Sequence, residues 1–293
     1  MKYKVRHTTI YNYSGKVGTC QNEARLKPIN TSSQECVDSQ LLIEPLPSDY
    51  SERSDFFGNK VCYFAIQQPH TKLTVTAVSE VHTRVEPRDF EKTGGMLCKD
   101  VVTHLRTKID TDTLNARQYV LNSPMVSAER ELQEYAQRSL AADRPVVEAV
   151  YDLMEKIHRD FTYEPGFTTL ATPLHEVLKH RRGVCQDFAH LAIGCIRSQG
   201  LAARYASGYI ETQPPPGQVK LIGADASHAW FSVFIPEMGW IDFDPTNNQM
   251  PMDKHVTVAI GRDYSDVTPL KGIIFGGGDH ELEVSVDMTN LGG

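Results

Sequence analysis

Three separated segments carry residue types that together support nucleophilic chemistry. Cys185 opens the amphipathic segment GVCQDFAHL, His228 lies in ASHAW, and Asp244 follows the apolar end of GWIDF. A thiol attacks a carbonyl group only as the thiolate, which a helix N-terminus and a neighbouring histidine both favour. The order Cys, His, Asp therefore predicts a nucleophile, a general base and a carboxylate that orients the base.

The elements expected around these residues would position them. Apolar spacing predicts a helix over residues 185–200, so that the cysteine lies in its first turn. Strands are predicted over residues 226–235 and 240–243, joined by a tight turn. Because paired strands hold side chains next to each other, a hairpin of this kind would bring His228 and Asp244 together.

Each of the three residues then has an expected role. His228 would accept the thiol proton and later return it to a leaving amine, while Asp244 would hold the other ring nitrogen and select the tautomer. The helix dipole and the backbone N–H of Cys185 would stabilise both the thiolate and the oxyanion of a tetrahedral intermediate. The predicted chemistry is attack of a thiolate on a carbonyl group with release of an amine.

Neighbouring polar residues leave alternatives open. Asp242 competes with Asp244, since alternation along a strand places both on one side. Asp244 is favoured because a Pro-Thr pair ends the strand there. Asp187 and His190 are expected to line the rim of the site. Tyr163 is expected to be a cleft-wall aromatic or to aim its hydroxyl at the oxyanion.

The remaining cysteines and histidines predict no further chemistry. Six cysteines are few for the length and show no CxxC spacing, so reduced and mostly buried thiols are expected, with Cys195 serving only in packing. Eleven histidines show no HxxxH or HExxH spacing, so neither a metal site nor another cofactor is predicted. The six cysteines are Cys20, Cys36, Cys62, Cys98, Cys185 and Cys195.

Composition narrows the classes of partner. The 293 residues are 40% hydrophobic and 23% charged, and the net charge of −7 comes with no run of Lys or Arg longer than a pair. Nucleic acid is therefore not expected as a partner.

The N-terminus lacks the apolar core of a signal peptide, and no apolar run approaches the length of a membrane span. A cytoplasmic protein without membrane contact is predicted, and the sequence does not indicate its oligomeric state.

The pattern along the chain predicts three regions. Residues 1–88 alternate with period two between Pro and Gly breaks and predict an antiparallel β-sandwich domain. Residues 89–127 form a connecting region whose weak periodicity allows a linker or strands. Residues 128–293 predict an α+β catalytic domain with a β-containing C-terminal tail, in which the glycine run at 276–278 is expected to be a flexible loop. Its further expected helices cover residues 128–140, 145–161 and 173–180, and its further expected strands cover 203–211, 256–260 and 281–288.

The three motifs give the chain a family resemblance. With GVCQDFAHL, ASHAW and GWIDFDPTNN, it resembles the transglutaminase-like superfamily, specifically the bacterial transglutaminase-like cysteine proteases. The resemblance implies a papain-like core, in which the nucleophile helix packs on an antiparallel sheet, after an all-β N-terminal domain. It also implies Cys185 as nucleophile, His228 as base and Asp244 as orienting acid, with no cofactor.

The resemblance further implies attack on carboxamides through a thioester. Hydrolysis of a peptide or protein amide by a cysteine peptidase or amidase is the favoured interpretation. A cross-linking transglutaminase, in which an amine replaces water as the acceptor, is the alternative within the enzyme class. A catalytically silent binding or scaffold module is the alternative from another class.

Overall fold

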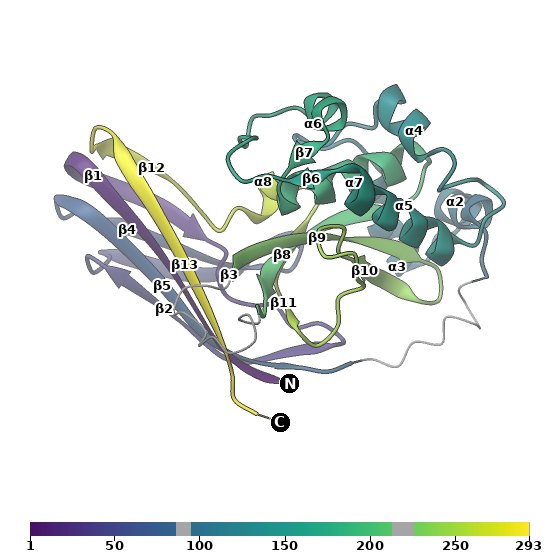
Figure 1. Cartoon of the computed structure of the whole chain (residues 1–293). Helices are drawn as coiled ribbons and strands as arrows, with labels where there is room; N and C mark the ends of the chain where they lie inside the picture. The colour runs from purple at the N-terminus through teal and green to yellow at the C-terminus, as the bar shows by residue number, and fades with distance from the viewer. Residues whose placement is uncertain (86–94, 213–225, 293) are drawn as a thin grey trace, which may run out of the picture.

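A curled antiparallel sheet lies beside a layer of helices on a second sheet (Figure 1). The computed structural model describes residues 1–85, 95–212 and 226–292. Both termini lie close together at one end of the curled sheet, where the backbone N–H of Leu291 donates to the carbonyl of Lys2. The predicted α+β class with a β-rich N-terminal region is confirmed.

Strand β1 organises the curled sheet. It spans 23 residues, and it pairs with β5 and β13 through its first half and with β4 and β12 through its second half. Side chains from both halves meet in one apolar core, which includes Val17, Phe64 and Val75. The strands of this sheet are β1 (Lys2–Ala24), β2 (Gln34–Glu44), β3 (Asp49–Ser54), β4 (Lys60–Ile66), β5 (His70–Thr83), β12 (Leu270–Gly276) and β13 (His280–Asn290).

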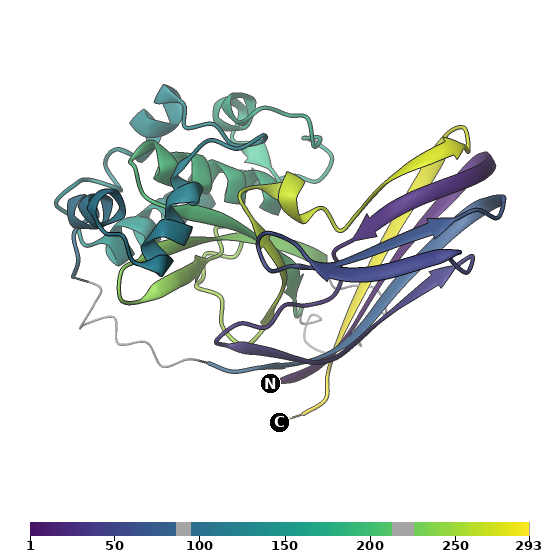
Figure 2. The ribbon, with the colours of Figure 1, turned by 180° about the vertical axis from the view of Figure 1, so that it is seen from behind.

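The C-terminal tail corrects the expected grouping of strands. The tail was expected to belong with residues 128–293, but β12 and β13 pair with β1 in the curled sheet, as the view from behind also shows (Figure 2). Gly276, Gly277 and Gly278 all have positive φ and form the turn between the two strands. This turn is hydrogen-bonded to β1, because the N–H of Gly15 donates to the carbonyl of Gly277 at 2.9 Å. The glycine run is thus an ordered turn rather than the expected loose loop.

The connecting region contains two α-helices and a short 3-10 helix where the structure describes it. Helices α2 (Cys98–Thr107) and α3 (Thr111–Arg117) and the short helix η1 (Gln118–Val120) replace the expected linker or strands. Cys98, Val101 and Leu105 have helical spacing and are buried in the larger core. Tertiary packing therefore determines the secondary structure of a segment whose own apolar periodicity is weak.

The second layer surrounds the predicted nucleophile. Helix α7 packs on strands β8 and β9 of a sheet with the order β10-β9-β8-β11, and the expected helices and strands appear within a few residues of their predicted bounds. Among the described residues, none of the helices combines the length and the apolar content needed to cross a bilayer. The elements are α4 (Arg130–Ala136), α5 (Val146–Asp160), β6 (Thr162–Tyr163), α6 (Leu174–His180), β7 (Arg182–Gly183), α7 (Cys185–Ser198), β8 (Ala203–Ile210), β9 (Ala226–Ile235), β10 (Gly239–Phe243), β11 (His255–Gly261) and α8 (Tyr264–Val267). Residues 214–217, where three prolines and a glycine predict a loop, lie outside the described residues.

Two buried amide side chains join the two sheets. Gln34 donates to the carbonyl of Thr257 at 2.8 Å and accepts from its N–H at 2.7 Å. Asn59 bonds in the same way to Ile260, at 2.7 and 2.8 Å. These pairs satisfy backbone groups on β11, the edge strand of the second sheet, and so fix the curled sheet against the layer that carries the site.

Candidate active site

The start of α7 positions the Cys185 thiol. Cys185 is the first helical residue, and the N–H of Val184 just before it donates to Asp187 Oδ2 at 2.8 Å. The same oxygen accepts from the hydroxyl of Thr168 at 2.6 Å. A Cβ at Gly183 would lie 2.6 Å from that oxygen, so the close approach of the carboxylate requires glycine at this position. Asp187 therefore ties both the helix start and an adjacent loop into place.

Asp187 and His190 do not line the rim as expected. Both are buried, because the face of α7 that carries them packs inside the protein. Burial raises the pKa of Asp187, although Val184 and Thr168 donate to it. His190 accepts from the N–H of Tyr264 at 3.1 Å, and burial lowers its pKa to about 4. A neutral, hydrogen-bonded His190 has a structural role.

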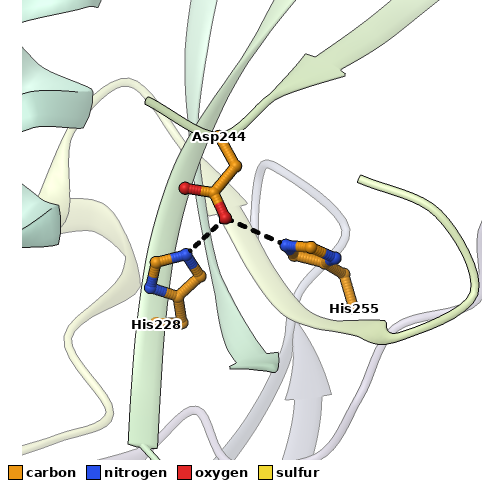
Figure 3. Close-up of side chains that lie close together, drawn as sticks. All are labelled: His228, Asp244 and His255. Atoms are coloured by element: carbon orange, nitrogen blue, oxygen red, sulfur yellow. Dashed lines mark hydrogen bonds and ion pairs between the residues drawn. The ribbon is translucent and has the colours of Figure 1, made fainter. Parts of the chain in front are cut away.

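Strands β9 and β10 bring the histidine to the carboxylate. The strands are antiparallel, with Phe231 opposite Phe243, so His228 approaches the residue that follows the end of β10. His228 Nε2 lies 2.8 Å from Asp244 Oδ2 (Figure 3). Cys185 and His228 line the same cleft, and the interaction of His228 with Cys185 helps to raise the pKa of the imidazole. Since Nε2 is engaged by Asp244, the Nδ1 nitrogen is the one left for the sulfur.

Asp244 is buried and fully surrounded by donors. Its Oδ1 accepts from the backbone N–H of Thr246 at 3.0 Å and of Asn247 at 3.2 Å. Its Oδ2 accepts from Asn247 Nδ2 at 2.7 Å and from His255 Nε2 at 3.1 Å, in addition to His228. An aspartate that binds the N–H groups of the next residues forms a typical turn, which explains the sequence DPTN at this place.

Two members of this network were not predicted from the sequence. The role of Asn247 could have been predicted, because an Asn in a turn that follows Asp can reach back to the carboxylate. The role of His255 could not have been predicted from the sequence, since His255 begins β11, which is separated from β9 by β8. Figure 3 shows Asp244 between His228 and His255. The second histidine thus shares the carboxylate with the first.

Electrostatic interactions between His228 and Asp244 favour the charged form of His228. Burial alone lowers the pKa of His228, but its hydrogen bonds and charge interactions with Asp244 and Cys185 raise it to about 9. Burial alone raises the pKa of Asp244, yet the bonds from His228, His255 and Asn247 hold it well below its usual range. An imidazolium and a carboxylate are therefore the stable forms at neutral pH.

The competing carboxylate has a different partner. Asp242 accepts a hydrogen bond from the hydroxyl of Ser232, the residue opposite it on β9. Its charge also acts on Arg204, whose guanidinium lies over the Trp240 ring. Asp244, and not Asp242, is the residue that the structure places on His228.

Tyr163 and Cys195 both have surroundings that suit packing. Tyr163 is half exposed, its ring packs edge-on against Phe188, and burial together with the charge of Cys185 raises its pKa. All six cysteines are free. The expected packing role of Cys195 is confirmed by its complete burial in the core, which raises its pKa to about 12.

One cluster of side chains has the composition of a metal site. Within the described ranges, ligand atoms of His228, Asp244 and His255 all lie within 4.8 Å of one another. These atoms are already joined by direct hydrogen bonds of 2.8 and 3.1 Å. An ion bound here would have to break both bonds and would compete with Cys185 for His228. The absence of a cofactor remains a prediction.

The site opens into a cleft of about 380 Å³. Cys185, Gln186 and His228 line one side of it. Thr9 of β1 and Val284 of β13 also line it, so the curled sheet contributes directly to the cleft. A thiol at a helix N-terminus, beside a histidine that a buried carboxylate orients, can perform acyl transfer.

Comparison with known proteins identifies the family. The model of the bacterial transglutaminase-like N-terminal region matches residues 3–82, and that of the transglutaminase-like superfamily matches residues 133–245. An uncharacterized protein of Mycobacterium tuberculosis is 40% identical over 304 residues, which cover 100% of this chain and 94% of that protein. The chain belongs to the transglutaminase-like superfamily.

Two further relatives bear on fold and chemistry. The crystal structure of a candidate cysteine protease from Cytophaga hutchinsonii has a TM-score of 0.78, covers 100% of this chain and 91% of that chain, and is 21% identical, which shows a shared fold. A protein-glutamine gamma-glutamyltransferase of Pseudomonas aeruginosa is 29% identical over 107 residues, or 34% of this chain and 16% of that protein. The transglutaminase-like fold predicted from the sequence is confirmed.

Proposed function

We propose that this transglutaminase-like protein is a thiol-dependent acyl-transfer enzyme that hydrolyses a peptide or protein amide. The observation that carries the proposal is that Asp244 is hydrogen-bonded to His228, which lines one cleft together with Cys185 and interacts with it electrostatically. An imidazolium beside the sulfur stabilises the thiolate form that attacks. Asp244 keeps the ring in position and holds the proton on Nε2, so that Nδ1 exchanges a proton with the reacting groups.

The proposed reaction has two halves. The thiolate of Cys185 attacks the carbonyl carbon, and the oxyanion that forms is stabilised by the N–H groups in the first turn of α7. His228 gives its proton to the leaving amine as the C–N bond breaks, which leaves a thioester. Water then loses a proton to His228 and attacks the thioester, releasing the acid and the thiolate.

Amine transfer is the second candidate. The name of the Pseudomonas aeruginosa relative, a protein-glutamine gamma-glutamyltransferase, favours an amine rather than water as the acceptor. The two candidates share the thioester and differ only in the second half. Dimethylcasein with dansylcadaverine separates them. Hydrolysis releases ammonia from glutamine carboxamides, or new amino termini from peptide bonds, without fixing the dye, whereas amine transfer fixes about one dye for each ammonia released.

The test of the nucleophile uses iodoacetamide. Cys36 is the matched control thiol, because it is partly exposed like Cys185 and lies far away on β2. At pH 7, peptide mapping should show that Cys185 is alkylated at least about tenfold faster than Cys36, since only Cys185 has an imidazolium beside it. His228→Ala should remove most of this difference. Equal, slow labelling of both thiols would instead favour a silent binding module.

The cellular location is part of the same proposal. Six free cysteines suit a reducing compartment, so we place the protein in the cytoplasm. The charge of −7 supports a peptide or protein partner rather than nucleic acid. Immunoblotting of cytoplasmic, periplasmic and membrane fractions tests the location, and recovery in the periplasmic fraction would contradict it.

A further inference from the structure

Strands β1 and β13 present one continuous face toward the second layer. They are antiparallel neighbours with Val5 opposite Met288 and His7 opposite Val286. The next pairs on the same face are Thr9 with Val284 and Tyr11 with Leu282, because side chains alternate along a strand. The face is therefore a ladder of side-chain pairs that runs along both strands.

One end of the ladder is buried in the protein core, and the other end lines the cleft. Val5, Val286 and Met288 are buried in the core that they share with α7 and β9. Farther along the same face, Val284 and Leu282 leave this core and line the cleft that contains Cys185. The buried half of the ladder thus holds the open half in the lining of the cleft that contains the thiol.

A buried histidine strengthens this attachment. His7 Nδ1 lies 2.9 Å from the hydroxyl of Tyr209 on β8, and His7 Nε2 lies 3.0 Å from the hydroxyl of Thr9. Burial lowers the pKa of His7 to about 4, so the ring is neutral at physiological pH. The cleft wall is consequently joined to the sheet that carries His228 without placing a charge in the cleft.

The open half of the wall is apolar. Leu282 is 53% exposed and Val284 is 50% exposed, and Leu170 in the loop before α6 lines the same cleft at 59% exposure. Among the described residues that line the cleft, none is Asp, Glu, Lys or Arg. Apart from the reacting pair Cys185 and His228, a cleft with these walls gains free energy by covering an apolar side chain and offers no partner to a charged one.

We propose that Leu282 and Val284 form a specificity wall that holds a large apolar side chain of the substrate next to the carboxamide under attack. The inference rests on the proposed function, because it assigns a substrate class to the same thiol. It gives the curled sheet a direct role in substrate selection. The preferred amide carries a leucine-sized, uncharged group, and a charged group of the same shape is rejected.

Two chloroacetamides of equal shape test the wall without knowledge of the natural substrate. N-(3,3-dimethylbutyl)chloroacetamide and its trimethylammonium isostere differ only in a carbon or a charged nitrogen at the branch. The thiolate of Cys185 displaces chloride from either probe and forms a thioether. The readout is the ratio of the two second-order rates, apolar over charged. We expect a ratio of about ten or more, the usual discrimination of an apolar pocket.

Matched double variants show where the discrimination arises. Leu282→Ser with Val284→Ser should lower the ratio several-fold toward one. Ile273→Ser with Phe275→Ser should leave it unchanged, because these residues are also more than half exposed but do not line the cleft. Val284→Asp should lower the ratio further by attracting the cationic probe. Circular dichroism and thermal unfolding confirm that each variant is folded.

The outcomes separate the two proposals. Fast alkylation of Cys185 with the same ratio in wild type and in the Leu282/Val284 variant overturns the wall and leaves the proposed function intact. Alkylation of Cys185 no faster than that of Cys36 overturns the proposed function, and the wall with it. A ratio that falls only in the wall variants supports both.

Discussion

At the scale of single residues, the buried charge of Asp244 is the feature that organises the site. A buried carboxylate is costly unless hydrogen bonds satisfy it, and here backbone N–H groups occupy one oxygen while His228, His255 and Asn247 occupy the other. This arrangement fixes the carboxylate, and the carboxylate in turn fixes His228. Charge and geometry at Cys185 therefore depend on residues that the substrate does not touch.

Replacing the two competing aspartates separates their roles. Asp244→Asn removes the negative charge and presents to His228 either an N–H donor or a weaker acceptor in place of the carboxylate oxygen. Iodoacetamide should therefore label Cys185 at least about a hundredfold more slowly. Asp242→Asn should change the rate less than about threefold, since Asp242 bonds to Ser232. Equal effects of the two substitutions would contradict the assignment of Asp244.

The raised pKa of His228 predicts a pH-dependent stability. Because the pKa rises from 6.5 to about 9 on folding, its stabilising effect is complete below pH 6.5 and is lost as the pH rises through about 9. The difference in unfolding free energy between wild type and His228→Gln should shrink by about 3 kcal/mol over this window. Urea unfolding from pH 6 to 10 measures it, and a constant difference would refute the coupling.

At the scale of elements, close contact between strands determines where the reactive groups lie. Gly208 on β8 lies opposite His228 on β9. A Cβ at Gly208 would lie 2.0 Å from the carbonyl oxygen of Val256 on β11 and 2.6 Å from the Trp230 ring. Only glycine lets β11 and the indole approach β8 this closely, and β11 carries His255 to Asp244.

A methyl group at this position should force the strands apart. Gly208→Ala is expected to destabilise the protein by about 3 kcal/mol, because the clash involves backbone atoms that cannot turn away. Gly18→Ala is the control on β1, where the nearest atom to the added carbon would be 3.7 Å away. Its effect should stay within about 1 kcal/mol. Urea denaturation compares the two variants, and similar losses would show that the close approach is unimportant.

At the scale of the whole molecule, buried polar groups contribute to the junction between the two sheets, beside the apolar core that the sheets share. Asn59 is fully buried, bonds to both backbone groups of Ile260, and also donates to Asp55 at 3.1 Å. Gln34 repeats the pattern at Thr257. The wall formed by β1 and β13 can face Cys185 only while this junction holds.

Asn59→Asp should weaken the junction. It removes the donor to Ile260 and places a second carboxylate beside Asp55, so a loss of about 3 kcal/mol is expected. Asn12→Asp is the control, since Asn12 also donates to a carboxylate, that of Glu283, but at the surface. Its cost should stay below about 1 kcal/mol. Hydrogen exchange in residues 255–261 should quicken only in Asn59→Asp, and protection equal to wild type would contradict the role of Asn59.

Local patterns predicted the elements that carry the site better than those that surround it. The helix at Cys185 and the strands of His228 and Asp244 have strong apolar periodicity and clear Gly or Pro boundaries, so their bounds are close to those predicted. The two short helices at 98–117 were missed, because their buried faces have few residues and tertiary contacts complete them. The buried positions of Asp187 and His190 were missed because a helix that packs on several sides has no free face.

The sequence by itself determined the residue types, their order and the local elements: a cysteine at a helix start, a histidine within a strand and an aspartate at a strand end. These features follow from interactions within a few residues of the chain. Only the tertiary structure decided that His255 shares Asp244, and that β13 returns to pair with β1 and form part of the cleft. Contacts between residues so far apart in sequence leave no local periodicity, because they depend on how whole sheets pack.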